Sequence, residues 1–181
     1  MLKWLMHFGT RQMEKTTNYD ASYMHEAIDV STAAGFKLSL LPLLSQHKED
    51  APLPLWYGAA MASVLEGDCG PCAQLMVDQG LKQGVSPKLM RALVARDLTA
   101  AGEEASLGFR YAEAVMADDI EAETLREEIQ KRYGERTLIA LAFATAFCRT
   151  YPVLKRGLGH GAACQKIKIG DNMESVVKHA A

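Results

Sequence analysis

Apolar residues along most of the chain recur at the three- and four-residue spacing of an amphipathic helix. Almost no segment shows the strict alternation or the β-branched runs of a strand. The pattern therefore predicts an all-α protein of about eight helices. The expected helices span residues 20–34, 36–46, 55–66, 71–84, 87–94, 103–117, 122–133 and 135–149, followed by a short helix and a loose tail.

Capping and breaking residues set the expected boundaries of these helices. Asp20 is a candidate N-cap for the first helix, and Gly35 is placed to end it. Pro71 falls in what would be a first helical turn, where its missing N–H costs nothing. Ser86 followed by Pro87 is a second signal of the same kind, a cap followed by a first turn.

The composition is that of an ordinary globular chain. Of the 181 residues, 49% are apolar and 23% are charged. A chain of this length buries enough surface to fold without a metal or a disulfide. We expect one helical domain over residues 1–181, and the four cysteines are then free to do chemistry.

Charge and hydropathy narrow the classes of function. A net charge of −2 argues against a nucleic-acid binder, because phosphate affinity depends on clustered Lys and Arg. The longest stretches without a formal charge, 51–65 and 137–148, are shorter than the roughly 18 apolar residues of a membrane span. The first nine residues lack the apolar core and cleavage site of a secretion signal. We therefore expect a cytoplasmic protein, with no membrane or nucleic-acid partner, whose cysteines are thiols, ligands or redox centres.

The most informative segment is the C-x-x-C of Cys69, Gly70, Pro71 and Cys72, which lies across a loop-to-helix boundary. Two cysteines at this spacing can close a small disulfide. The free N–H groups and the positive dipole end of a helix stabilise a thiolate over a thiol. One sulfur can then attack a peroxide or a disulfide, and the other can displace the product from it.

Three other interpretations of the pair compete with a redox role. Zinc would need a second close pair of ligands, whereas Cys148 and Cys164 are single and distant. Two buried, inert cysteines in a helical core are a further alternative. A thioredoxin shares the tetrapeptide Cys-Gly-Pro-Cys but requires a βαβ setting, and the helical pattern rejects it.

The order of motifs resembles a known family. An Ala-rich helix, an acidic turn, the C-x-x-C and then residues 81–93 (LKQGVSPKLMRAL) are similar to the core of the carboxymuconolactone decarboxylase superfamily, on its alkyl hydroperoxidase D-like branch. Residues 109–114 and 125–149 look like that superfamily's later helices. The resemblance covers residues 53–149, which leaves an N-terminal helical extension (1–50) and a tail (160–181) outside it.

The resemblance implies a homo-oligomer with thiol peroxidase or disulfide reductase activity in antioxidant defence. Its partners would be a peroxide or disulfide substrate and a thiol reductant or reductase protein, and no metal or organic cofactor would be needed. The family assigns attack on the peroxide to the second cysteine, here Cys72, and resolution to the first, here Cys69. A thioredoxin-like logic would reverse these roles.

The chain departs from the family at its proton relay. Where peroxidase members have a Glu and a His, this chain has Tyr57 and Met76. A thioether cannot carry protons, and a phenol with a pKa near 10 is a poor base, although its O–H can donate a hydrogen bond to a thiolate. Glu66, just before the thiols, is the nearest candidate for a replacement relay, against a plain solvated helix end. Asp68 is expected to cap the following helix.

The remaining candidates carry less chemistry. His160 lies near Cys164 in sequence, but its glycine neighbours favour an ordinary loop. The leucine-rich second helix is expected to make core or subunit contacts. We therefore predict a thiol-disulfide oxidoreductase or peroxidase with catalytic residues Cys69, Cys72 and Glu66. The alternatives are a non-catalytic assembly or redox sensor, and a lactone decarboxylase-like enzyme.

Overall fold

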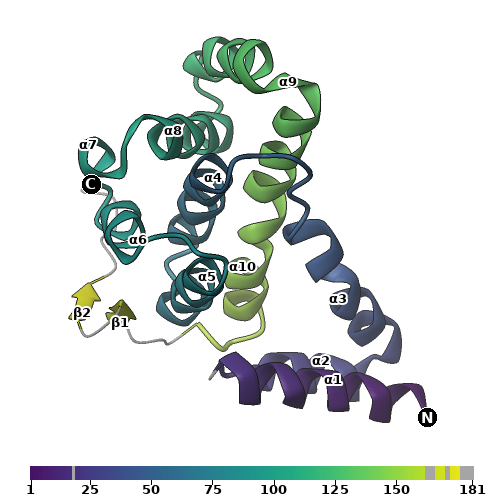
Figure 1. The fold of residues 1–181 in the computed structure, drawn as a ribbon. Helices are drawn as coiled ribbons and strands as arrows, with labels where there is room; N and C mark the ends of the chain where they lie inside the picture. The colour runs from purple at the N-terminus through teal and green to yellow at the C-terminus, as the bar shows by residue number, and fades with distance from the viewer. Residues whose placement is uncertain (18, 162–165, 170–171, 176–181) are drawn as a thin grey trace.

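The computed structural model describes residues 1–17, 19–161, 166–169 and 172–175. In this part of the chain the architecture is helical, as the spacing predicted, with one short hairpin (Figure 1). The helices are α1 (Leu2–Thr17), α2 (Ser22–Val30), α3 (Thr32–Ser45), α4 (Leu53–Glu66), α5 (Gly70–Lys82), α6 (Pro87–Val94), α7 (Leu98–Ala101), α8 (Glu103–Ala117), α9 (Glu121–Cys148) and α10 (Thr150–Gly157). The strands are β1 (Lys166–Ile169) and β2 (Asn172–Ser175), which pair antiparallel.

Helix α4 is the centre of the molecule. Every residue from Leu55 to Leu65 is buried, and helices α5, α6, α8 and α9 contact it (Figure 1). A helix that is apolar on all sides is stable only inside a core. Fully burying one leucine such as Leu55 stabilises the fold by about 1.5–3 kcal/mol. The core therefore forms around the helix that leads directly into the C-x-x-C.

Two glycines allow α4 and α8 to approach closely. A Cβ atom on Gly58 would meet the carbonyl oxygen of Ala105, and one on Gly108 would meet the carbonyl oxygen of Leu55. Both distances would be well under the 3.0 Å below which real Cβ contacts essentially never fall. Only glycine fits at either position without moving a helix apart.

The N-terminal helices differ from the expected ones. The predicted helix 20–34 ends early, at Val30, because Ser31 is extended and its hydroxyl caps α3 by accepting from the N–H of Ala34 at 3.2 Å. Gly35, expected to end a helix, lies inside α3, where a Cβ would collide with Ile28 of α2. The glycine serves close packing of α2 on α3 rather than termination. Asp20 is not the N-cap of α2, because Ala21 holds that position. The Asp20 carboxylate lies one residue before the cap and accepts from the N–H of Ser22 at 3.0 Å.

The predicted break between helices 122–133 and 135–149 is confirmed. The helical trace of α9 runs through both, but Gly134 has a φ of 86° and a ψ of 170°, which are not helical values. The positive φ is a conformation that glycine adopts without strain. The first half of α9 carries most of its charges and the second half most of its core contacts.

One helical stretch, Glu121–Gly157, is long and apolar enough to cross a membrane by length and composition. This is weak evidence for a membrane span, because core helices of soluble proteins pass the same test. In its most apolar window 39% of the residues are buried inside the molecule. Leu125, Ile129 and Leu141 of α9 pack in the hydrophobic core.

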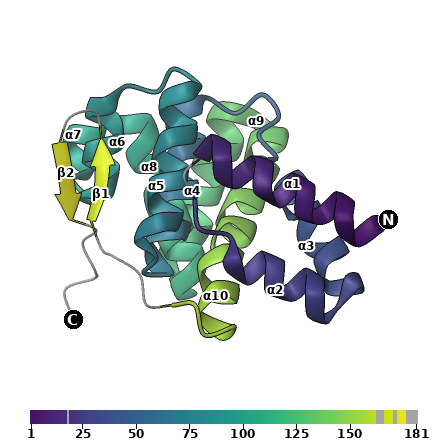
Figure 2. The same ribbon diagram turned by 90° about the horizontal axis from the view of Figure 1, so that it is seen from below.

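The tail is not wholly irregular, contrary to expectation. Its β1–β2 hairpin lies beside α5 (Figure 2), and Ile167 and Ile169 are buried. The Gln74 carboxamide on α5 donates to the carbonyl oxygen of Lys168 at 2.8 Å and accepts from its N–H. Gln74 therefore binds the strand as a neighbouring backbone would. Cys164 lies outside the described residues.

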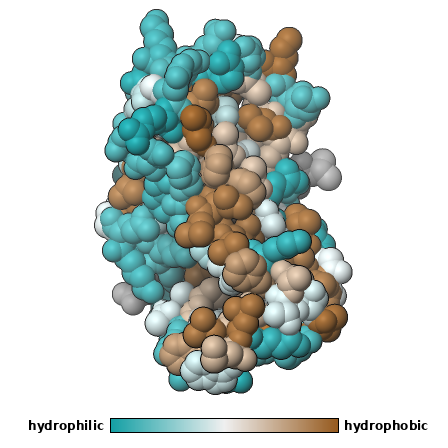
Figure 3. All heavy atoms as spheres, turned by 90° about the vertical axis from the view of Figure 1, so that its right-hand side faces the viewer, coloured by the Kyte–Doolittle hydropathy of each residue, from teal (hydrophilic) through white to brown (hydrophobic). Residues whose placement is uncertain are grey.

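Figure 3 views the side on which α3 lies and shows a continuous apolar band on the surface. Several large apolar side chains of α3 and the second half of α9 are exposed: Phe36, Leu40, Leu43, Leu44 and Ile139. The leucine-rich helix, expected to make core or subunit contacts, thus turns much of its apolar surface outward.

Candidate functional site

Cys69 and Cys72 form a disulfide at the start of α5. Cys69 is the N-cap of this helix, and its Sγ atom accepts a hydrogen bond from the N–H of Cys72 at 3.3 Å. The sulfur therefore takes the capping position that was expected for Asp68, whose φ of 50° instead makes the turn out of α4. The predicted C-x-x-C at a helix N-terminus is confirmed, with the sulfur itself facing the free N–H groups.

The two sulfurs lie under the surface but are not sealed from it. Cys69 and Cys72 expose 6% and 5% of their surface, so burial alone does not distinguish them. Cys69 lines a small pocket of about 60 Å³ between the start of α5 and α10. The described residues around this pocket are Gly67, Asp68, Cys69, Pro152, Lys155, Arg156, His160 and Gly161.

Two cationic side chains, Lys155 and Arg156, line this pocket together with one carboxylate, Asp68. The Arg156 guanidinium donates to the carbonyl oxygen of Gly67 at 3.1 Å and so ties α10 to the turn before the disulfide. Lys155 is only 3% exposed, and its ammonium donates to the carbonyl oxygen of Asp20 at 3.4 Å. Positive charge and a helix N-terminus both favour the thiolate form of a neighbouring cysteine. The site is thus arranged to hold negative charge on sulfur.

His160 closes the pocket from the loop after α10. Its Nε2 lies 2.7 Å from the Glu26 carboxylate, and its Nδ1 lies 3.3 Å from the Ser22 hydroxyl. The glycines on either side of His160 predicted an ordinary loop. Nothing in the sequence indicated that this histidine lies near the C-x-x-C. The contacts to α2 bring the loop over the pocket that Cys69 lines.

The other sulfur faces the N-terminal part of the chain. The phenolic oxygen of Tyr19 lies 3.6 Å from Sγ of Cys72 and 3.4 Å from the phenolic oxygen of Tyr23. Both tyrosines are buried, and desolvation by burial raises the pKa of each phenol. The two side chains therefore stay protonated near neutrality, as hydrogen-bond donors.

Local contacts fix Tyr19 in this place. The N–H of Ala21 donates to the Glu14 carboxylate at 3.1 Å, and Ala21 is completely buried. The Lys155 ammonium lies 5.1 Å from the centre of the Tyr19 ring, a cation–π distance. Tyr19 and Ala21, just before α2, are thereby held against α10 and the disulfide.

Glu66, the predicted replacement relay, has a different neighbourhood. Its carboxylate pairs with the Arg149 guanidinium at 3.1 Å, and it lines a separate surface pocket with Arg110 and Glu113. The structure brings Cys69 and Cys72 together and turns Glu66 toward the other side of the α4 end. A relay role for Glu66 stays a prediction.

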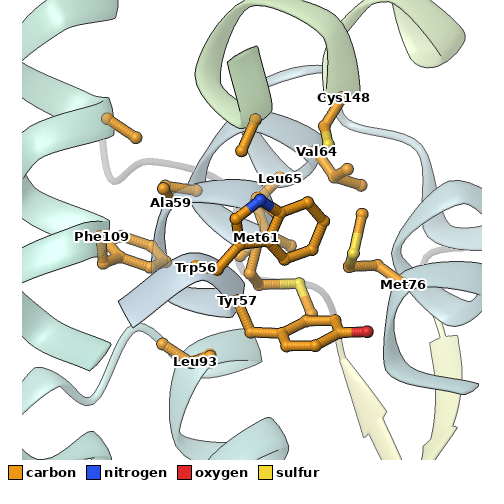
Figure 4. Packing of buried hydrophobic residues seen from close by; sticks show 14 of the residues in the cluster. Trp56, Tyr57, Ala59, Met61, Val64, Leu65, Met76, Leu93, Phe109 and Cys148 are labelled. Atoms are coloured by element: carbon orange, nitrogen blue, oxygen red, sulfur yellow. The ribbon is translucent and has the colours of Figure 1, made fainter. Parts of the chain in front are cut away.

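Tyr57 and Met76, at the positions of the family's relay, pack in the apolar core (Figure 4). Burial raises the pKa of the Tyr57 phenol, and no described residue forms a hydrogen bond with its hydroxyl. The phenol that lies against a sulfur of the disulfide is therefore that of Tyr19. Tyr57, which the family resemblance suggests as a hydrogen-bond donor to the thiolate, does not form this contact.

The third cysteine described, Cys148, is a buried free thiol at the end of α9. Its Sγ donates to the carbonyl oxygen of Ser45 at 3.4 Å, and burial raises the pKa of the thiol to about 12. Such a thiol is a poor nucleophile near neutrality. Among the described residues, no group of three or more His, Cys, Asp or Glu side chains is placed to hold a metal ion.

Comparisons with known proteins do not assign this site. No family model, curated protein or solved structure matches the chain. Membership of the carboxymuconolactone decarboxylase superfamily therefore stays a prediction that rests on the order of motifs alone.

Proposed function

We propose that this protein is a thiol-disulfide oxidoreductase that reduces peroxides or partner disulfides through Cys69 and Cys72. The observation that supports the proposal is a disulfide at the N-terminus of α5 with one of its residues lining a small cation-rich pocket. Both sulfurs belong to the first turn of one helix, so opening the bond need not separate two elements of the fold. The sulfurs can then cycle while the core stays intact.

The chemistry has two half-reactions. In the first, a thiolate of the dithiol form attacks a peroxide, giving a sulfenic acid and an alcohol or water. The other sulfur then displaces hydroxide, which leaves as water, and the disulfide forms. In the second, two thiols of a reductant open the disulfide, and their own sulfurs leave as a disulfide. A partner disulfide replaces the peroxide through the same thiolate attack.

Several contacts support turnover rather than a purely structural bond. The N-terminus of α5, together with Lys155 and Arg156, stabilises a thiolate and so eases both the opening of the bond and attack by the reduced form. In this proposal the reacting end of a substrate enters the small pocket that Cys69 lines. The antioxidant role and a homo-oligomeric state follow from the family resemblance.

The test is steady-state turnover of hydrogen peroxide and of a small disulfide, with dithiothreitol as the reductant. We expect Cys69→Ser and Cys72→Ser each to abolish turnover, whereas the matched control Cys148→Ser should retain it. Unchanged turnover in both of the first two variants would exclude the proposal. A single oxidation followed by no further consumption would instead favour the redox sensor.

A further inference from the structure

The two sulfurs of the disulfide face different surroundings. Cys69 lines the pocket between the start of α5 and α10. Sγ of Cys72 lies against the phenol of Tyr19, a side chain that is only 4% exposed. An incoming group therefore meets Cys69 first, with Cys72 behind it under a tyrosine.

From this asymmetry we infer that Cys69 is the sulfur that exchanges with outside partners. We also infer that the Tyr19 hydroxyl donates a hydrogen bond to the thiolate that forms on Cys72 when the disulfide opens. The inference rests on the proposed function and gives the two cysteines distinct roles. It reverses the assignment that the family resemblance implies, in which Cys72 attacks.

The reductive step can be followed atom by atom. A thiolate of the reductant attacks Sγ of Cys69, and a new sulfur–sulfur bond joins the two. The Cys69–Cys72 bond breaks, and its electron pair leaves on Sγ of Cys72 as a thiolate. A second thiolate of the reductant then releases Cys69 and forms the reductant's disulfide, so two electrons reach the protein.

The Tyr19 hydroxyl is placed to assist the leaving sulfur. In the disulfide its hydrogen has two acceptors within reach, the Tyr23 oxygen at 3.4 Å and Sγ of Cys72 at 3.6 Å. A cystine sulfur is a weak acceptor and a thiolate is a strong one. When charge develops on Cys72, the hydroxyl hydrogen therefore turns from Tyr23 to the sulfur. Burial keeps the phenol protonated for this role.

The pocket also indicates the class of partner. The opening of about 60 Å³ beside Cys69 is lined by two cations, Lys155 and Arg156, and one carboxylate, Asp68, so positive charge is in excess. This size admits a single sulfur or peroxide group, and the positive charge favours one that arrives as an anion. The geometry thus fits a thiolate at the tip of a narrow molecule. It also fits a peroxide, whose leaving oxygen develops negative charge during the reaction.

The first experiment compares the two sulfurs in chains with one site cysteine each. Both variants carry Cys148→Ser and Cys164→Ser, to which either Cys72→Ser or Cys69→Ser is added. The reagent is 5,5′-dithiobis(2-nitrobenzoate), whose release of coloured thiolate reports the rate. We expect Cys69 to react at least about tenfold faster than Cys72. An equal or faster reaction at Cys72 would overturn the assignment.

The second experiment tests the phenol with a matched pair of deletions. Tyr19→Phe removes the hydroxyl that faces the sulfur, and Tyr57→Phe removes a buried hydroxyl for which no described residue is a partner. We expect opening of the disulfide by dithiothreitol to slow roughly tenfold in Tyr19→Phe and to stay unchanged in Tyr57→Phe. Equal rates in all three proteins would remove the role of Tyr19.

A third readout separates chemistry from altered packing. In the Cys69→Ser background, thiolate absorbance at 240 nm follows ionisation of Cys72. Adding Tyr19→Phe should move its midpoint upward by about one pH unit, because the thiolate loses a donor. A packing defect alone would lower thermal stability and leave the midpoint in place.

These outcomes also separate the inference from the proposed function. If turnover needs both cysteines but Cys72 reacts first, the proposed function stands and the inference fails. If turnover needs neither cysteine, both fail together.

Discussion

Gly58 of α4 and Gly108 of α8 each lie against the backbone of the opposite helix. Their Cα atoms face the carbonyl oxygens of Ala105 and Leu55. Since the obstacle to a larger residue is backbone in both cases, no change of side-chain rotamer can make room. The two glycines therefore fix the distance between α4 and α8.

Replacing one of these glycines should destabilise the whole molecule. We expect Gly108→Ala to lower the free energy of unfolding by about 2–3 kcal/mol, since α4 and α8 must separate to admit the methyl group. Urea denaturation measures the change. Gly9→Ala on α1 is the matched control: no atom lies within 4 Å of its Cβ position, so its stability should stay equal or rise slightly. Equal stability of both variants would contradict the packing argument.

The hairpin should loosen when its hydrogen bonds to α5 are removed. Gln74→Ala deletes both bonds to the backbone of Lys168. Hydrogen exchange at the Lys168 amide should accelerate by about tenfold, which corresponds to about 1.4 kcal/mol. The control is Gln83→Ala at the exposed end of the same helix, which should leave this amide unchanged. Unaltered exchange in Gln74→Ala would show that other contacts hold the strand.

Stability should fall at alkaline pH because of Cys148. Its folded pKa of about 12 lies above the ordinary 9.0 of a thiol. Below pH 9 the thiol is protonated in both states and contributes its full stability. Between pH 9 and 12 only the unfolded thiol loses its proton, so the free energy of unfolding should decline by about 1.4 kcal/mol per pH unit.

The test compares urea denaturation of the wild-type chain and Cys148→Ala at pH 8, 9, 10 and 11. Burial also raises the pKa of Tyr151, to about 12, so both proteins should lose stability above pH 10. The wild-type chain should show the steeper decline. Parallel curves would mean that Cys148 is not sealed from solvent.

Glu66 should prove separable from the sulfur chemistry. Its carboxylate pairs with Arg149 at a half-exposed position, where an ion pair contributes less than about 1 kcal/mol. We expect Glu66→Gln to change the free energy of unfolding by no more than this and to leave alkylation of the reduced cysteines within about twofold of the wild-type rate. A tenfold loss of alkylation rate would restore Glu66 as the relay.

We expect the apolar band over α3 to mediate self-association; the family resemblance implies a homo-oligomer, and α3 is the leucine-rich helix expected to make core or subunit contacts. Leu43 of α3 is 73% exposed. We expect the wild-type chain to sediment as an oligomer and Leu43→Glu to sediment as a smaller species with unchanged helicity. Ile120→Glu, at an exposed position before α9, is the matched control and should keep the wild-type size. If all three proteins sediment as monomers, the band has another use.

The helical architecture was predictable because its signals are local. Ser86 and Pro87 start α6 as expected, with the Ser86 hydroxyl accepting from the N–H of Leu89 at 3.1 Å. The limits of α8 also agree with the spacing. Gly35 was misleading because glycine marks either a helix end or a close approach, and here its position against Ile28 required the second. Only the packing of one helix on another decides between these uses.

The site was predictable in part, for the same reason. The spacing of Cys69 and Cys72 is local, and it correctly placed a disulfide pair at a helix start. Tyr19, Lys155 and His160 come from segments on either side of the motif in sequence, and nothing in their own surroundings marks them. Their meeting depends on how α1, α2 and α10 close around α5, which is a property of the tertiary fold.

A cystine whose shielding phenol belongs to a segment 53 positions away cannot be transplanted as a short motif. A peptide of residues 65–75 would carry the same two sulfurs into bulk water, without Tyr19 above one of them or Lys155 near the other. The redox potential of this bond is therefore set by the assembled molecule rather than by the tetrapeptide. Moving the tetrapeptide into another protein would therefore also require a residue that takes the place of Tyr19.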